Sequence, residues 1–240
     1  MSGAILVLGA RNLGGAVLDH FLSLGWRGAA VAQSADTLAS VRGRGALALE
    51  ADAADPDELA AAMERSRAEL GGLDVVVNAV SAARPPGSGP FGGGPIAEAT
   101  LEGYRGWGGA VGEQAFVFLN TGVKTLRAAG GGGTLIQVTG GSARRAMPGR
   151  GIWASGTAAL RALTHAAAQE LREEGIHVAL LIVDATIESP KTAEFTRGAP
   201  PDSLADQAEI ARAVEYLAGQ SARGLTHELT LTPAGDRWLP

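Results

Sequence analysis

The sequence contains no cysteine among its 240 residues, and it has only two tyrosines and two lysines. The absence of cysteine excludes disulfide bonds, thiolate nucleophiles and sulfur-ligated metals. The four histidines (His20, His165, His177 and His227) are scattered along the chain and lack the spacing of a metal site. We therefore expect no bound metal, and any catalytic chemistry has to come from other side chains.

Long apolar runs and an excess of positive charge are also missing. No apolar run is long enough to cross a bilayer, and the start MSGAILVLGA has neither the basic residues nor the cleavage site of a secretory signal. The formal net charge of −5 disfavours nucleic acid or an anionic membrane surface as the main partner. These features predict a cytoplasmic protein, and 46% hydrophobic residues are ordinary for a globular chain.

Short apolar runs alternate with longer segments of helical period. Apolar strands that are each followed by a helix predict a parallel sheet covered on both faces. Right-handed crossovers then give a doubly wound α/β fold of the Rossmann type, with about seven strands in three layers, α/β/α. The expected strands are 4–8, 28–32, 46–50, 73–79, 134–139, 176–183 and 228–232. The expected helices are 13–25, a short one ending at 42, 56–70, 101–129, one within 149–171, and 206–219.

Residues 81–95, SAARPPGSGPFGGGP, form a segment rich in glycine and proline that is too long for a plain connector. We find no internal repeat and no domain boundary, so residues 1–240 are expected to form a single domain. The segment follows the fourth strand, at the carboxyl edge of the sheet, where ligands of such folds bind. It is either a mobile flap over a ligand site or disordered, and its position favours the flap.

The first strand is followed by GARNLGG, residues 9–15. A glycine turn between a strand and a helix places backbone N–H groups and the positive helix end against a phosphate. The alternative is a tight turn that only packs the helix on the strand. At this point the chain resembles the short-chain dehydrogenase/reductase family, whose turn reads Gly-x-x-x-Gly-x-Gly. Gly9 and Gly15 match the first and third glycines, whereas Leu13 replaces the second. In the family this second glycine lets the backbone approach the pyrophosphate.

The resemblance covers nearly the whole chain and implies a nicotinamide dinucleotide cofactor. In EADAAD, residues 50–55, it implies that Asp52 hydrogen-bonds the adenine amino group, while Asp55 is the better cap for the following helix. The segment VNAV, residues 77–80, keeps two residues of the family's Asn-Asn-Ala-Gly. Its asparagine, Asn78, has a plainer alternative role, which is to brace the backbone.

The identity of the dinucleotide depends on the end of the second strand. NAD specificity normally needs an acid there, but Ala32 and Gln33 occupy the place. Arg11 could pair with the 2′-phosphate of NADP, or it could be a solvated charge. NADP is therefore favoured, with NAD or no dinucleotide left open. The residues expected at the cofactor are Gly9, Arg11, Asn12, Leu13, Gly15, Gln33, Asp52, Ala53, Asn78 and Ala79.

The segment GIWASGTAALRALTHAAAQEL, residues 151–171, resembles the family's catalytic helix, which carries Tyr-x-x-x-Lys. Trp153 falls on the tyrosine, Thr157 on the lysine and Gly140 on the catalytic serine, and none of them can exchange a proton near neutral pH. In the family the tyrosine transfers the carbinol proton, and such positioned transfer contributes about 10²–10⁴-fold to the rate. The resemblance thus implies an NADP-linked oxidoreductase that lacks the usual Ser-Tyr-Lys proton relay.

Other residues could replace the relay. Ser142 lies two residues beyond the serine position, and Asp184 follows the sixth strand, where the family usually has Pro-Gly. The family also has an asparagine upstream of these residues, and its position falls on Glu113 or Gln114. Glu113 could therefore be a second carboxylate in the same cleft. Loop hydrogen bonds and turn formation are the plainer roles of Ser142 and Asp184. The carboxylates keep open an isomerase, lyase or cyclase on the same fold, and a non-catalytic binding or partner subunit is the third hypothesis.

The substrate is expected to be a small molecule. Trp153 either lines a pocket for an apolar or aromatic substrate or fills the core. Arg144, Arg145 and Arg150 either attract a carboxylate or phosphate or form a solvated basic loop. Family members usually pair the helices before and after strand five, and the small residues of 158–168 would allow such packing. A homodimer or homotetramer is therefore expected.

Overall fold

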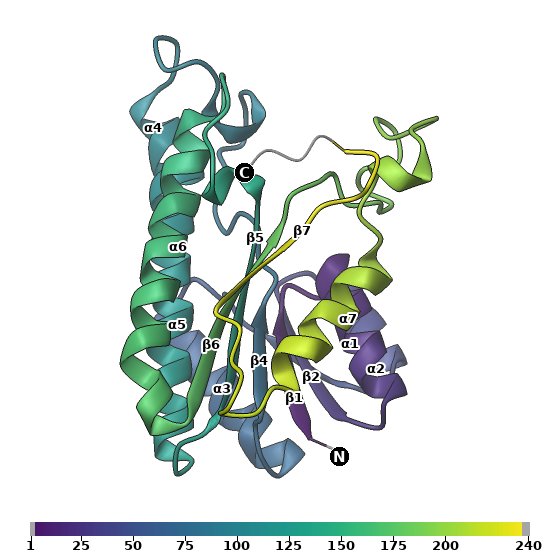
Figure 1. Cartoon of the computed structure of the whole chain (residues 1–240), viewed down its shortest axis with the longest axis vertical. Helices are drawn as coiled ribbons and strands as arrows, with labels where there is room; N and C mark the ends of the chain where they lie inside the picture. Colours follow the sequence, from purple (N-terminus) through teal and green to yellow (C-terminus); the bar gives the residue numbers. More distant parts are fainter. Residues whose placement is uncertain (1–2, 237–240) are drawn as a thin grey trace.

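A parallel sheet forms the centre of the molecule in the computed structural model, which describes residues 3–236 (Figure 1). Seven strands pair in the order β3-β2-β1-β4-β5-β6-β7, and every neighbouring pair is parallel. The doubly wound Rossmann-type sheet expected from the sequence is confirmed. The strands are β1 (Ala4–Leu8), β2 (Arg27–Ala32), β3 (Leu47–Glu50), β4 (Val75–Asn78), β5 (Gly133–Gly140), β6 (Ile176–Val183) and β7 (Glu228–Leu231).

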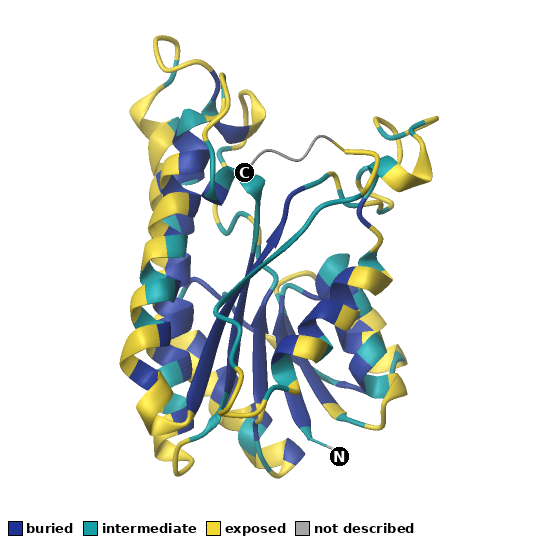
Figure 2. Ribbon diagram, in the orientation of Figure 1, coloured by how far each residue is buried: buried dark blue, intermediate teal, exposed yellow. Residues whose placement is uncertain are grey.

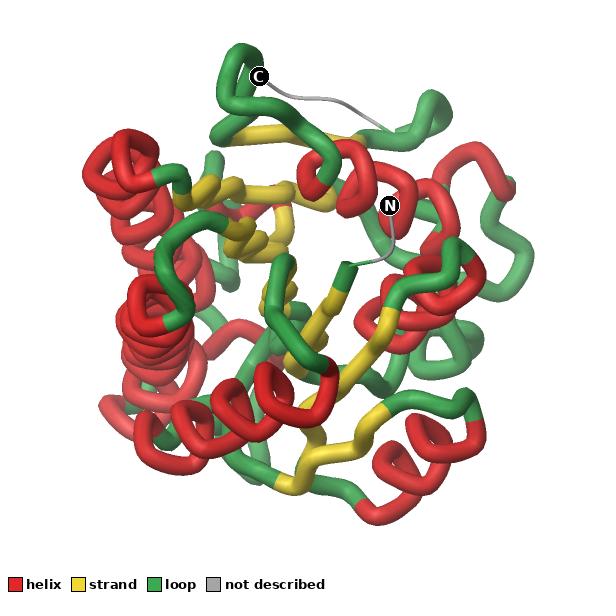
Figure 3. Tube along the Cα trace, turned by 90° about the horizontal axis from the view of Figure 1, so that it is seen from below, coloured by secondary structure: helices red, strands yellow, loops and turns green. Residues whose placement is uncertain are grey.

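Helices cover both faces of this sheet, as the view along the strands shows (Figure 3). One face carries α3 (Pro56–Leu70), α5 (Ala110–Ala128) and α6 (Gly151–Leu171), and the other carries α1 (Leu13–Ser23), α2 (Ala35–Gly43) and α7 (Gln207–Ala218). Successive residues of a strand point to opposite faces, so Leu6 belongs to one core and Val7 to the other. Most of the strands are consequently buried on both sides (Figure 2), which explains their continuous apolar sequences.

The helix starts follow local capping rules. Asp55 accepts hydrogen bonds from the backbone N–H groups of Asp57 and Glu58, both at 3.0 Å, and Pro56 takes the first helical position of α3. Asp206 caps α7 in the same way, accepting from Ala208 N at 2.9 Å. The expectation that Asp55 caps the helix is confirmed, and Asp52 is left outside that cap.

The stretch expected as one helix over 101–129 contains a change of helix type. It begins with α4 (Leu101–Tyr104), widens into a π-helical turn (Arg105–Gly109) and continues as α5. The turn lies against α6 at very short range, since a Cβ placed on Gly156 would come within 2.4 Å of the Gly108 carbonyl oxygen. Only glycine allows this approach, and the widened turn directs the buried side chain of Trp107 toward α6.

Three long connections gather at the carboxyl ends of the strands, which form the upper edge of the sheet in Figure 1. Residues 81–95 follow β4 and lie near α4 at the upper left, and residues 184–206 follow β6 and lie at the upper right. The third connection joins β5 to α6 and contains a 3₁₀ turn (Gly141–Ala143). Within residues 3–236, no helix is both long and apolar enough to cross a membrane.

Candidate functional site

A cavity of about 480 Å³ opens at this edge of the sheet. Its volume falls within the range of about 300–1,000 Å³ that is usual for ligand sites. It lies where the strand order reverses between β2-β1 and β1-β4, the place where ligands bind in open α/β sheets. Its walls are residues 9–13, 31–34, Thr37, 51–54, 79–83, Val111, 138–140, Trp153, Thr157, Leu160, Ile187, Ser189, Lys191 and Thr192.

The glycine turn forms one end of the cavity. Gly9 has φ +84°, a left-handed conformation that favours glycine. A Cβ on Gly14 would lie 2.4 Å from the Gly9 carbonyl oxygen, so α1 rests directly on the turn. Asn12 precedes α1 without a side-chain cap, which leaves the first N–H groups of the helix without a side-chain partner. The turn therefore fits an anion such as a diphosphate, although the Leu13 side chain lines the cavity where the family has glycine.

Asp52 lies on the cavity wall, as expected for a residue that contacts adenine. Its Oδ1 accepts a hydrogen bond from Ala54 N at 2.9 Å, which fixes the carboxylate in a local turn. Its Oδ2 lies 3.3 Å from the Arg84 guanidinium, and Arg84 comes from the segment 81–95. No sequence pattern predicted this pair, which joins the segment to the β3 side of the cavity.

Asn78 does not line the cavity. Its side chain is buried and donates to the side-chain oxygens of Gln114 at 2.8 Å and Gln137 at 2.9 Å, while its own Oδ1 accepts from Val80 N. Gln114 also donates to the carbonyl of Ala53 at 3.4 Å. This network corresponds to the bracing alternative for Asn78, since it ties β4, β5, α5 and the connection from β3 to α3 together.

The structure brings Gly140, Trp153 and Thr157 to the other end of the same cavity. Trp153 and Thr157 are buried, and the Thr157 hydroxyl donates to the carbonyls of Trp153 (3.1 Å) and Ala154 (3.2 Å) within its own helix. Gly140 ends β5 and offers no side chain. None of the three supplies a titratable group to the cavity.

The proposed substitutes for the relay lie elsewhere. Glu113 is exposed on α5, whereas its neighbour Gln114 takes the inward position. Asp184 is buried and forms a bidentate pair with Arg145, whose Nη2 lies 3.1 Å from Oδ1. Neither of these two carboxylates lines the cavity, and Ser142 does not either. Of the two residues considered for the upstream asparagine position, Gln114 is thus the one that points inward, and Glu113 does not reach the cavity.

The Arg145–Asp184 pair fixes the connection after β5 to the end of β6. A Cβ added to Gly141 would lie 1.8 Å from Asp184 Oδ1, so the carboxylate occupies the space that a side chain at 141 would need. Asp184 N also donates to the carbonyl of Leu231 on β7 at 2.9 Å. Of the arginine cluster, Arg145 thus has a structural partner and Arg150 lies 5.1 Å from the centre of the Phe91 ring.

Trp153 also belongs to a cluster of three aromatic rings. Phe91 lies 5.0 Å from Trp107 and 5.4 Å from Trp153 between ring centres, and the two tryptophans are 5.9 Å apart. The rings come from the segment 81–95, the π-helical turn and α6. Gly92 has φ +82°, and a Cβ there would lie 3.3 Å from the Trp153 Cβ. Trp153 therefore combines the two roles considered for it, since it lines the cavity and also holds the segment 81–95.

Sequence reasoning missed Lys191 and its neighbours Ser189 and Thr192, which line the cavity from the connection after β6. The available signal was their position just beyond the carboxyl end of a buried strand. Among the cavity-lining residues, the ionisable side chains are Arg11, Asp52 and Lys191. No group of three histidine, aspartate or glutamate side chains in the described part of the chain could hold a metal ion.

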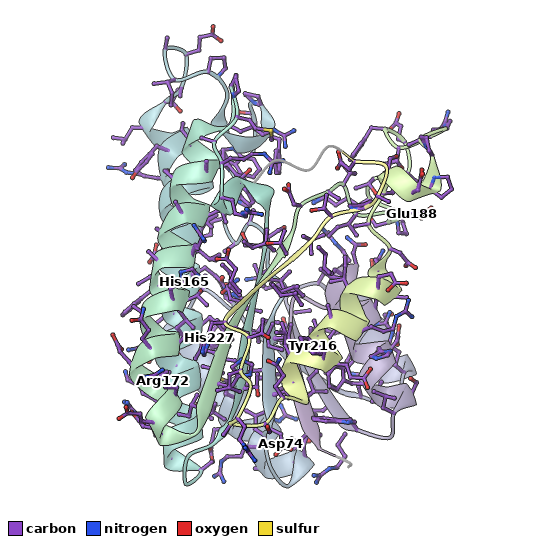
Figure 4. All side chains as sticks on the ribbon, in the orientation of Figure 1. Asp74, His165, Arg172, Glu188, Tyr216 and His227 are labelled. Carbon is purple, nitrogen blue, oxygen red and sulfur yellow. The ribbon has the colours of Figure 1, made fainter. Side chains whose placement is uncertain are left out.

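None of the four histidines lines the cavity. His165 on α6 is 2.8 Å from Glu228 on β7, which Arg161 also contacts (Figure 4 labels His165). Burial would raise the pKa of Glu228, but the hydrogen bond and charge of Arg161, together with His165, hold the pKa below its usual range. His177 is buried beside His227 and donates from Nε2 to the Thr226 carbonyl, and burial lowers its pKa.

Comparison with known families agrees with this geometry. The sequence profile of the family described as enoyl-(acyl carrier protein) reductase matches residues 9–235. A short-chain dehydrogenase from Rhodopseudomonas palustris is 25% identical, with a TM-score of 0.72 over 96% of this chain and 98% of that one. The chain belongs to the short-chain dehydrogenase/reductase family. No curated protein matches it in sequence.

Further solved structures share the fold at lower identity. A metagenomic short-chain oxidoreductase in complex with NADP is 22% identical, with a TM-score of 0.76 over 97% of both chains. A variant of actinorhodin polyketide ketoreductase with NADPH is 20% identical, with a TM-score of 0.79 over 99% of this chain and 98% of that one. The likeness extends over whole chains and is not limited to the nucleotide-binding half.

Proposed function

We propose that this chain binds NADP(H) in the cavity and reduces a small apolar or aromatic substrate without the Ser-Tyr-Lys relay of its family. One observation carries the proposal: a single cavity joins the glycine turn at Gly9 to the wall formed by Trp153 and Thr157. Two solved proteins of the same fold hold NADP or NADPH. The bound nicotinamide would supply the hydride.

The walls of the cavity suit the parts of NADP(H). The turn at Gly9 and the start of α1 would receive the diphosphate, and Asp52 would accept from the adenine amino group. Gln33 brings no negative charge to the end of β2, and Arg11 is an exposed cation on the same wall. A 2′-phosphate is therefore accommodated there and attracted by Arg11, which supports NADP over NAD.

The substrate end is mainly apolar. It is lined by Val111, Val138, Trp153 and Leu160. These side chains would exclude water from one side of an aromatic or apolar substrate. The Trp153 indole can donate a hydrogen bond to a carbonyl oxygen but cannot give it a proton. The proton of the product would then come from solvent water, so the reaction would lack a factor of about 10²–10⁴ in rate that positioned acid catalysis supplies.

A fluorescence titration tests the cofactor half of the proposal. Wild-type protein is expected to bind NADPH more tightly than NADH, and Arg11→Met is expected to weaken NADPH about tenfold, since a charge-assisted contact is lost, while leaving NADH unchanged. Arg65→Met on α3, whose side chain pairs with Glu69 away from the cavity, is the matched control. If the wild type binds neither NADPH nor NADH, the proposal is wrong.

A second candidate is a subunit that binds NADP(H) but does not catalyse. It is favoured by the absence of a titratable group at Gly140, Trp153 and Thr157. The third candidate, a non-redox enzyme, would need Asp184 and Glu113 as catalytic carboxylates. The ion pair of Asp184 with Arg145 and the exposed position of Glu113 argue against it. Single-turnover NADPH oxidation with a panel of aromatic aldehydes, ketones and quinones separates the candidates, because binding without any oxidation favours the subunit.

We also propose that the chain forms a homodimer or homotetramer through the outer faces of α5 and α6. Phe116 on α5 is 53% exposed, and Ala159, Ala162 and Ala166 are exposed on α6, which gives a surface on which another helix can pack closely. Light scattering on the wild type and on Ala162→Glu measures the mass, which should fall to that of one chain in the variant. A cytoplasmic location remains a prediction from the sequence.

A further inference from the structure

We propose that Lys191 holds the diphosphate of the bound dinucleotide from the connection between β6 and α7. The proposal rests on the proposed function, because it requires a dinucleotide in the cavity. Lys191 lines that cavity together with Ser189 and Thr192. In the view of Figure 4 this connection is marked by Glu188, at the upper right above the sheet.

The backbone around Lys191 is held in place by hydroxyl groups. Thr192 Oγ1 donates to the carbonyl of Ile187 at 2.7 Å and accepts from Ser189 N at 2.9 Å. Ile187 in turn pairs with Ala205 in an isolated parallel bridge. The turn from 189 to 192 is thus closed on itself and attached to the base of the connection. The hydrogen bonds fix the backbone from which the Lys191 side chain extends, while the flexible side chain can still move its charge within the cavity.

The charges in the cavity leave Lys191 without a partner. Arg11 and Lys191 are the cations among the lining residues and Asp52 is the anion, and Asp52 is already paired with Arg84. Lys191 is exposed, and none of the ion pairs found within residues 3–236 includes it. The cavity therefore carries unpaired positive charge in a chain whose formal net charge is −5. A ligand with negative charge fits this wall.

The strand order decides which phosphate lies near Lys191. Arg11, Gln33 and Thr37 line the part of the cavity beside β1 and β2, where a 2′-phosphate would be held. Lys191 follows β6, which is separated from β1 by β4 and β5. The connection after β6 leads, however, to α7, which packs beside α1 (Figure 1), and Ile187 belongs to the same hydrophobic cluster as Leu13 at the start of α1. The turn that carries Lys191 therefore lies on the side of the glycine turn and α1, where the diphosphate would be held, and away from β2.

Leu13 gives a physical reason for an additional phosphate contact. A glycine at this position would let backbone N–H groups approach the diphosphate, whereas the leucine side chain lines the cavity there. The turn therefore offers a weaker anion site than one with glycine. A lysine on a neighbouring wall restores attraction with a point charge, which needs no close backbone approach.

The chain offers a matched control, since Lys124 and Lys191 are its only lysines. Lys124 is exposed on α5 and does not line the cavity. We expect Lys191→Met to raise the dissociation constants of NADPH and NADH alike, each by about tenfold, while Lys124→Met changes neither. Lys191→Arg should keep most of the affinity. The loss is equal for both dinucleotides because both carry the diphosphate, whereas Arg11→Met should change their ratio.

Lysine acetylation gives a readout that does not depend on mutation. Bound NADPH is expected to slow the labelling of Lys191, measured by mass spectrometry with limiting acetylating reagent, and to leave Lys124 unaffected. If the wild type binds NADPH, the Lys191→Met variant has the same dissociation constants and bound NADPH does not slow the labelling of Lys191, this inference is overturned but the proposed function is not. A loss confined to NADPH would also overturn it, because Lys191 would then contact the 2′-phosphate. If the wild type binds neither dinucleotide, the proposed function fails and this inference fails with it.

Discussion

Trp153 illustrates how one residue can alter both chemistry and packing. Its indole offers a hydrogen-bond donor where the family's tyrosine offers a proton, and the same ring contacts Phe91 and Trp107. Aromatic pairs of this kind each contribute about 0.5–1.5 kcal/mol beyond area burial. The residue therefore stabilises the wall of the cavity while removing the usual acid from it.

Restoring the three side chains tests this view directly. There is room for a serine at Gly140, since a Cβ there would meet only the Val183 carbonyl oxygen at 3.8 Å. We expect the triple variant Gly140→Ser, Trp153→Tyr, Thr157→Lys to increase NADPH-dependent reduction by about 10²-fold or more, because positioned proton transfer returns. The increase should depend on pH through the new tyrosine, and steady-state rates from pH 6 to 10 measure it.

The control is the triple variant Gly140→Ala, Trp153→Phe, Thr157→Met, which matches the shapes without any exchangeable proton. Equal rates in the two triple variants would show that the missing relay does not limit reduction in this cavity.

The sequence located some site residues well and others poorly. The resemblance to the family placed Gly140, Trp153 and Thr157 together, and the structure does so because β5 ends and α6 begins at the same edge of the sheet. One residue in a helix corresponds to a rotation of about 100°, so an uncertainty of one position was enough to place Glu113 inward instead of Gln114. Loop conformations determine which residues pair with Asp184 and Asp52 and where Lys191 lies. The hydrophobic periodicity of the sequence does not predict such conformations.

At the level of elements, burial explains which predictions succeeded. Strands such as β1 and β6 are buried along their whole length, so their apolar runs stood out in the sequence. The expected helix over 101–129 missed the π-helical turn, because that turn depends on the contact between Gly108 and Gly156, which are far apart in the sequence. A pattern within one segment cannot report a backbone contact with another segment.

The segment 81–95 is held at two places, by the Arg84–Asp52 pair and by Phe91 on the two tryptophans. The ion pair is partly exposed and contributes little, of the order of 0–1 kcal/mol. The rings are the stronger attachment. We expect Phe91→Ala to increase hydrogen exchange within residues 81–95 by about tenfold, since roughly 1–2 kcal/mol of ring contact is lost, with little change in global stability.

Phe195→Ala is the matched control, because Phe195 is 73% exposed and has no aromatic partner among the described residues. Exchange in residues 81–95 that stays at the wild-type rate in the Phe91 variant would mean that the rings do not hold the segment.

For the whole molecule, polar contacts join elements that are distant in the sequence. Glu228 on β7 connects the edge strand to α6 through Arg161, and His20 on α1 contacts Glu215 on α7 at 2.6 Å. His177 is buried on β6 beside the same edge strand, and its burial lowers its pKa. The edge of the sheet should therefore respond to pH before its centre does.

The sign of this response follows from His177. Its pKa is lowered in the folded protein from a usual value of 6.5, so the unfolded chain binds a proton first as the pH falls. We expect the free energy of unfolding to fall below about pH 6.5, by at most about 1.4 kcal/mol per pH unit for this single group. Urea unfolding at pH 7.5, 6.5 and 5.5 measures the slope.

His177→Leu should flatten the slope in this window, whatever its effect on stability at pH 7.5. Below about pH 4.5 both proteins should lose stability further, because the pKa of Glu228 is lowered on folding and its contribution disappears on protonation. A wild-type protein with constant stability from pH 7.5 to 5.5 would contradict the role given to His177.

The carboxylate of Asp184, which occupies the space beside Gly141, also has an evolutionary consequence. An alanine at 141 would collide with Asp184, and a proline at 184, as the family usually has, would lose the N–H that reaches Leu231. A side chain at 141 is therefore tolerated only where Asp184 has been replaced, so that substitutions at the two sites are epistatic. We expect homologous lineages to have coevolved here, with glycine at 141 wherever an aspartate replaces the proline.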